Sequence, residues 1–209
     1  MKQLTIQFDK IEKSHGKLVG GKCFNLGKLR QRLSQQGIRV PNGYAITTNS
    51  WREFLAGNKD LKKNLQKALK AIDWDNEATV KEQSAKVKAM VVGAKMPTAI
   101  AKAITKAYQN LEKEYRKGLD VAVRSSAVEE DLDGTSFAGQ YDTHLNVRGV
   151  ENVIHMTQMC FSSLFNERAL WYRREKKFPL FPEKGIAVGV QKMVRSDLAA
   201  SGIGFSQEP

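Results

Sequence analysis

The chain has 209 residues, of which 41% are hydrophobic and 27% are charged, and it carries a formal net charge of +12. This composition supports a packed core and excludes a disordered, collagen-like or disulfide-stapled chain. The sequence contains no run of about 18 apolar residues, and its N-terminus lacks the pattern of a secretory signal, so we expect no membrane span. Two cysteines, Cys23 and Cys160, fit no metal-ligand spacing, and we therefore expect a reduced, cytoplasmic protein.

The positive charge is concentrated in the middle of the chain. Between Lys59 and Lys117 there are 14 Lys and Arg residues against 7 Asp and Glu residues. The lysines are spaced so that an apolar stripe remains, as on the exposed faces of amphipathic helices. Because no RGG tract, zinc-finger spacing or RNA-binding sheet motif accompanies them, a nucleic-acid partner is not expected.

Residues 1–58 have the pattern of a mixed α/β lobe. Apolar and polar residues alternate near the N-terminus, which indicates a short strand. Pro and Gly in the segment Val-Pro-Asn-Gly indicate a turn. The expected elements are a strand at 4–8, a helix from Gly20-Gly21-Lys22 to Gly37, a turn at 40–43, a strand at 44–46 and a short helix at 47–55.

Residues 59–118 have the pattern of a helical lobe. Apolar residues recur every three to four positions from Asp60 to Arg116. This spacing predicts helices at 61–72, 76–92 and 97–117, with Gly118 as the C-cap of the last one.

Residues 119–209 are expected to combine a sheet with a helix. Val121-Ala122-Val123 is a short apolar run that we expect to form a strand and to deliver Arg124-Ser125-Ser126 into a loop. The remaining expected elements are a strand at 145–147, one long helix at 150–176, a β-rich run at 185–194 and a further strand at 201–206 that completes a hairpin.

Three segments combine glycine, small hydroxyl residues and a cation, which together bind phosphate groups. They are Gly20-Gly21-Lys22, Arg124-Ser125-Ser126 and the loop from Gly134 to Gly139. Taken singly, each segment also fits an ordinary turn, and Arg124 also fits an ion pair with the acidic residues at 129–131. The residues alone leave both interpretations open.

A longer pattern links these segments. The chain resembles the N-terminal nucleotide-binding region of the phosphoenolpyruvate synthase (pyruvate, water dikinase) family, which pyruvate phosphate dikinase and rifampicin phosphotransferase share. The resemblance covers nearly the whole chain and is weakest at 59–117. Its motifs, in chain order, are VGGKCFNLGKL, VPNGYAITTNSWREFL, VAVRSSAVEEDLDGTSFAGQYDTHLNV, CFSSLFNERALWYR and VQKMVRSDLAASGIGFS.

The resemblance implies an ATP-grasp fold, in which two lobes clamp Mg·ATP. In the family the nucleotide phosphorylates a histidine on a separate domain, and that histidine passes the phosphate to pyruvate. Carried over to this sequence, Lys22 and Arg124 contact the ATP phosphates. Gly139 and the small-residue loop before it cover the triphosphate, Thr143 lies close by, and Gln191 lies near the adenosine.

The family pattern continues past Pro209 to a Glu and a Gln that hold Mg²⁺, so we assign neither a metal ligand nor a catalytic residue in this chain. The carrier-histidine and pyruvate-binding domains are likewise expected outside it, where they could act in trans. We therefore expect an α+β, ATP-grasp-type nucleotide-binding region, incomplete at its C-terminal end, that binds ATP but does not turn over alone. The alternative is a truncated, non-catalytic relative that binds a nucleotide or a partner protein.

Overall fold

The computed structural model describes residues 2–128 and 139–204, and a five-stranded antiparallel sheet lies at its centre. The strand order is β1-β2-β5-β3-β4, so the last strand of the chain lies at the centre of the sheet, between the pair β1-β2 and the pair β3-β4. Every neighbouring pair is antiparallel. The strands are β1 (Thr5–Gln7), β2 (Gly43–Ile46), β3 (Val121–Ala127), β4 (Thr143–Val147) and β5 (Ile186–Lys192).

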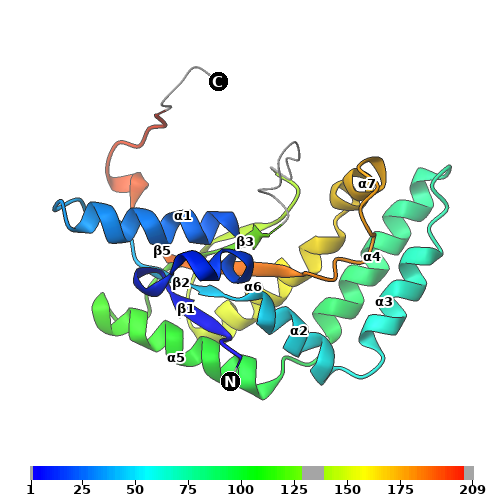
Figure 1. Ribbon diagram of the computed structural model, residues 1–209, viewed down its shortest axis with the longest axis horizontal. Helices are drawn as coiled ribbons and strands as arrows, with labels where there is room; N and C mark the ends of the chain where they lie inside the picture. Colours follow the sequence, from blue (N-terminus) through cyan, green and yellow to red (C-terminus); the bar gives the residue numbers. More distant parts are fainter. Residues whose placement is uncertain (1, 129–138, 205–209) are drawn as a thin grey trace.

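Helices cover both faces of this sheet. Helix α1 lies on one face, and α5 and α6 lie on the other, while α3, α4 and α7 extend to one side (Figure 1). The helices are α1 (Gly16–Ser34), α2 (Thr48–Gly57), α3 (Leu61–Lys70), α4 (Glu77–Gly93), α5 (Thr98–Glu114), α6 (Val150–Ser162) and α7 (Glu167–Glu175). The arrangement confirms the α+β class.

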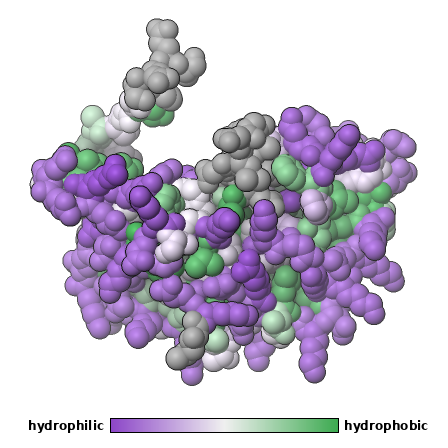
Figure 2. All heavy atoms as spheres, viewed as in Figure 1, coloured by the Kyte–Doolittle hydropathy of each residue, from purple (hydrophilic) through white to green (hydrophobic). Residues whose placement is uncertain are grey.

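Two hydrophobic clusters stabilise the two faces of the sheet. The larger one joins β2, β3 and β5 to α2–α6 and includes Trp51, Phe54 and Phe161, whose rings are in contact. The smaller one lies between the sheet and α1, and its buried members are Ile6, Phe8, Ile11, Val19, Cys23 and Ala45. On the outside, hydrophilic side chains dominate the face shown in Figure 2. Most lysines of α3 and α4 are exposed, among them Lys62, Lys63, Lys67, Lys81 and Lys86.

Most of the expected elements are present. The strands at 44–46 and 185–194, the helices of the 59–118 region and the first strand agree with the structure within a few residues. The lobe boundaries at 58 and 118 stay a prediction.

Three expected elements in the last third of the chain are wrong. Arg124, Ser125 and Ser126 do not form a loop, because β3 continues through them to Ala127 and pairs with β5 along its whole length. The single helix at 150–176 is two helices, α6 and α7, separated by a 3-10 turn and by Asn166 in an extended conformation. Residues 199–204 form no strand. The expected second strand of the hairpin is therefore absent as far as the structure describes it.

Two helix ends also differ from expectation. Helix α5 ends at Glu114 with Tyr115 as its C-cap, and Gly118 lies beyond it in a turn with φ of 66°. Helix α1 begins at Gly16 rather than at the glycine pair, and Gly20 instead kinks it. The loop from Gly134 to Ala138 lies outside the described residues.

Candidate functional site

The kink in α1 is held by a serine on β3. Gly20 has φ of 69° and ψ of 164°, a conformation that essentially only glycine adopts. Ser126 Oγ accepts a hydrogen bond from the Cys23 amide (3.1 Å) and donates one to the Val19 carbonyl (2.8 Å). In an unbroken helix the Cys23 amide would donate to the Val19 carbonyl, four residues earlier, and Ser126 Oγ bridges these two groups instead. In this way β3 fixes where the second half of α1 begins.

The approach of α1 to β3 at this point leaves no room for a side chain. A Cβ on Gly20 would lie 2.2 Å from the Ser126 carbonyl oxygen. Glycine is therefore required at position 20 for two reasons, the positive φ of the backbone and the close packing against β3. Lys22, which follows the kink directly, is half-buried and lies on the helix that this contact positions.

Arg124 lies two residues before Ser126 on the same face of β3. Its partner in register on β5 is Gly189, where a Cβ would lie 2.8 Å from Cys23 Sγ and 3.5 Å from Arg124 Cγ. The absence of a side chain at Gly189 thus makes room for Cys23 and for the aliphatic stem of Arg124. Both side chains consequently lie on the face of the sheet that α1 covers.

The guanidinium of Arg124 has an unusual environment. Its Nε atom is buried and has no hydrogen-bond partner among the described residues. A buried cationic donor without an acceptor is unfavourable in an isolated fold. An anion bound at this place would supply the acceptor.

The structure brings three of the predicted site residues onto one face of the sheet. Thr143 on β4 is the register partner of Arg124 and is exposed. Gln191 on β5 is the register partner of Ala122, so its side chain lies on the same face as Arg124, one pair further along. Gln191 Nε2 donates to the Pro41 carbonyl at 3.2 Å, which fixes its amide.

Gly139, the fifth predicted residue, is exposed and has φ of 72°, with no atom of the described structure within 4 Å of the position of a Cβ. It lies four residues before Thr143, and it directly follows residues outside the described part of the chain. Its role over the phosphates stays a prediction.

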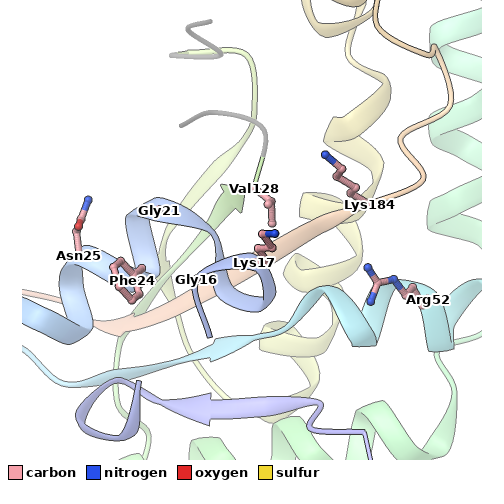
Figure 3. A pocket seen from close by; sticks show the side chains of 8 residues that line it. All are labelled: Gly16, Lys17, Gly21, Phe24, Asn25, Arg52, Val128 and Lys184. Carbon is pink, nitrogen blue, oxygen red and sulfur yellow. The ribbon is translucent and has the colours of Figure 1, made fainter. Parts of the chain in front are cut away.

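Next to the kink is a pocket of about 570 Å³, a volume in the range of small-molecule sites. Its lining comes from both halves of α1, from α2, from the end of β3 and from the segment before β5 (Figure 3). The lining residues are Gly16, Lys17, Gly21, Phe24, Asn25, Arg52, Val128 and Lys184. None of the five predicted site residues lines it. The sequence gives no local signal for this pocket, because its cations come from three separate segments.

The described residues do not form a metal site. Among them, no three His, Cys, Asp or Glu side chains gather closely enough to hold a metal ion. Burial raises the pKa of the Cys160 thiol, which therefore stays protonated and acts as a small apolar group in the core. Burial also lowers the pKa of His144, whose register partner Val123 lies in the core on the face opposite α1.

Comparison with known proteins agrees with this arrangement. The family described as "Pyruvate phosphate dikinase, AMP/ATP-binding domain" matches residues 16–209, so the chain belongs to that family. A phosphoenolpyruvate synthase of Aquifex aeolicus is 40% identical over 206 residues, which is 98% of this chain and 24% of the relative. The phosphoenolpyruvate synthases of Synechocystis sp. and Escherichia coli are 38% and 35% identical, each over 97% of this chain and 25% of their own length.

The chain thus spans about a quarter of the length of these relatives and resembles their nucleotide-binding part. The predicted family is confirmed. Within the described ranges, none of the helices combines the length and the apolar composition needed to cross a bilayer.

Proposed function

We propose that this chain binds the phosphates of ATP as the nucleotide-binding part of a pyruvate, water dikinase of the phosphoenolpyruvate synthase type. In this proposal Arg124 and Lys22 neutralise the phosphate oxygens from two elements, β3 and α1. Thr143 offers a hydroxyl beside Arg124, Gly139 belongs to the loop over the triphosphate, and Gln191 lies near the adenosine. We further propose that the fold is of the ATP-grasp type and that the protein works in the cytoplasm.

The observation that carries the proposal is the environment of Arg124. Its stem is packed over Gly189, its Nε is buried, and it has no acceptor among the described residues. A structural arginine at such a place would be expected to have a carboxylate or carbonyl partner. A phosphate oxygen would satisfy the guanidinium, and Arg presents a fork of donors suited to phosphate.

The chemistry expected of these residues is binding and orientation. Cations and amides around a phosphoryl group stabilise the charge that develops during phosphoryl transfer. Mg²⁺, when bound, would help to neutralise the charge of the phosphates, and among the described residues no three His, Cys, Asp or Glu side chains gather to hold it. Transfer to a carrier histidine and then to pyruvate would require the remaining domains, either in the same chain or in trans.

Calorimetric titration of the chain with Mg·ATP tests the proposal. We expect Lys22→Ala and Arg124→Ala each to weaken binding by about 1.5–3 kcal/mol, the scale of a hydrogen bond to a charged group. Arg168→Ala, at an exposed position of α7, is the matched control and should bind like the parent. A folded parent that gives no heat at millimolar nucleotide would contradict the proposal.

Surface composition favours a second candidate, a non-catalytic module that contacts a partner protein. Several large apolar side chains are exposed on β4 and after β5, among them Leu145 (60%), Val194 (58%), Leu198 (74%) and Ile203 (87%). Contiguous apolar surface marks contact sites, and three of these side chains lie within residues 194–203. Binding to the remaining domains or to another protein distinguishes this candidate from the first. If the chain is such a module, that binding should persist in the Arg124→Ala variant.

A further inference from the structure

We propose that the pocket beside the α1 kink is a second anion site, separate from the phosphate site around Arg124, and that it takes a small anion with two or more negative charges. The proposal rests on the cations that line this pocket and on the absence of acidic side chains among its lining residues within the described part of the chain.

Three cationic side chains from distant parts of the chain meet at this pocket. Lys17 lies in the first turn of α1, Arg52 lies on α2, and Lys184 precedes β5. In Figure 3, Lys17 lies close to Val128, and the side chains of Arg52 and Lys184 extend from α2 and from the segment before β5. Three like charges at one opening repel each other, and a bound anion would relieve that repulsion.

The described residues do not neutralise these cations. No acidic side chain is among the lining residues of the pocket within the described ranges. Glu183, which precedes Lys184 in sequence, forms its ion pair with Lys62 on α3 instead (2.8 Å). Arg52 donates to the Asn49 side chain (3.1 Å), an uncharged acceptor that leaves its positive charge uncompensated.

The backbone adds to the positive potential. Gly21 begins the second half of α1, 14 residues long up to Ser34, and it lines the pocket. The amino end of a helix carries partial positive charge and unpaired amides. Together with the three side chains, this end makes the pocket suited to an anion.

The pocket is distinct from the proposed phosphate site. Neither Lys22 nor Arg124 lines it. Arg124 lies beneath α1, between Gly189 and Thr143. The cations of the pocket are Lys17 on the first half of α1, Arg52 on α2 and Lys184, two residues before β5. Ligands of the two sites should therefore respond to different substitutions.

The test is a calorimetric titration of the chain with pyrophosphate and, separately, with citrate, at constant ionic strength. The variants are Arg52→Gln/Lys184→Gln and Arg124→Ala, with Lys102→Gln/Lys106→Gln on α5 as the charge-matched control. We expect the pocket variant to weaken binding of at least one anion by about tenfold or more, as for lost charge-assisted hydrogen bonds. Arg124→Ala and the control should leave citrate binding unchanged. Because all the substituted pocket residues are exposed, unchanged thermal midpoints should confirm that the variants fold.

If the pocket prefers pyrophosphate to citrate, its ligand is a phosphate. If it prefers citrate, its ligand is a carboxylate. Anion binding that is equal in all variants overturns the proposal, and so does binding that is lost in Arg124→Ala but kept in the pocket variant. If Mg·ATP fails to bind while the anion titration behaves as expected, the proposed function fails and the second site stands.

Discussion

Ser126 supplies the capping group that Gly20 lacks. The second half of α1 begins after Gly20, which has no side chain to accept a hydrogen bond from the first amides of the helix. Ser126 Oγ, from β3, accepts the bond of the Cys23 amide and so occupies the place of an N-cap side chain. A strand residue remote in sequence thereby fixes the helix that bears Lys22 relative to the strand that bears Arg124.

The first prediction concerns this cap. Ser126→Ala would leave the buried Cys23 amide and Val19 carbonyl without the bonds that Ser126 makes, at 3.1 and 2.8 Å. Two buried polar groups without partners predict a loss of about 2–4 kcal/mol in the free energy of unfolding. Urea denaturation measures it, with Ser34→Ala, at an exposed position near the end of α1, as the control. Equal midpoints for the two variants would show that the serine does not hold the kink.

The second prediction separates backbone strain from close packing. Gly20→Ala should cost more than about 3 kcal/mol, because φ of 69° is unfavourable for alanine and its Cβ would overlap the Ser126 carbonyl oxygen. Gly118→Ala, with φ of 66° and no atom within 4 Å, should cost only about 1 kcal/mol for the backbone conformation. Denaturation midpoints compare the two variants. Similar losses would mean that the contact with β3 contributes nothing beyond the strain.

The sequence predicted elements well where local pattern decides them. The helices at 61–70, 77–93 and 98–114 follow an apolar period of three to four residues, and the structure keeps it: Leu65, Val87 and Ile104 are fully buried. The α+β class followed from the same patterns. These elements need little information from the rest of the chain.

Where contacts between distant segments determine the local structure, the prediction from the sequence was wrong. Arg124-Ser125-Ser126 is polar and resembles a loop, yet β5 pairs with it and Asp142 accepts bonds from the Ser125 amide and hydroxyl. Asn166 breaks the expected long helix because its amide donates to the Gln140 carbonyl and the Asp142 carboxylate, and its oxygen accepts from Lys88. The partners of Asn166 lie 24 to 78 residues away in sequence, beyond any local pattern.

The residues of the candidate site also divide into those that the sequence predicted and those that only the folded chain reveals. Family resemblance supplied Arg124, Thr143 and Gln191, and the structure places them on one face of the sheet. It supplied neither Ser126 as the holder of the kink nor the cations of the second pocket. Only the folded chain brings Lys17, Arg52 and Lys184 together.

The third prediction concerns pH. A hydrogen bond and charge attraction from Arg148, with a smaller attraction from Arg116, hold the pKa of Asp120 below its ordinary value. A carboxyl whose pKa is lower in the folded state stabilises the fold above its unfolded pKa, about 3.9, and loses that contribution as the pH falls through the folded value. Arg148→Gln should therefore be less stable than the parent at pH 7, and the difference should shrink below about pH 4.

Urea midpoints of the parent and Arg148→Gln between pH 7 and pH 2.5 measure this difference. Lys62→Gln, which removes the exposed ion pair with Glu183, is the control and should change the midpoint little at any pH. A difference between the parent and Arg148→Gln that stayed constant down to pH 2.5 would assign the effect to packing of the arginine rather than to its charge.

The fourth prediction concerns the relation between stability and binding at Arg124. Its Nε is buried and has no acceptor among the described residues, so this donor should add nothing to the stability of the ligand-free fold. Arg124→Met keeps an apolar stem over Gly189 and removes the guanidinium. We expect its free energy of unfolding without nucleotide to be equal to that of the parent or higher, since replacing a buried donor that has no acceptor by an apolar group is neutral or stabilising.

The same substitution should abolish the rise in thermal midpoint that Mg·ATP gives the parent, because that rise depends on nucleotide affinity for the folded state. Arg168→Met on α7 should change neither the free energy of unfolding without nucleotide nor the rise in thermal midpoint with Mg·ATP. If Arg124→Met instead unfolded more easily without nucleotide while keeping the full Mg·ATP shift, Arg124 would be a structural residue of β3. The phosphate site would then have to be sought elsewhere in the chain.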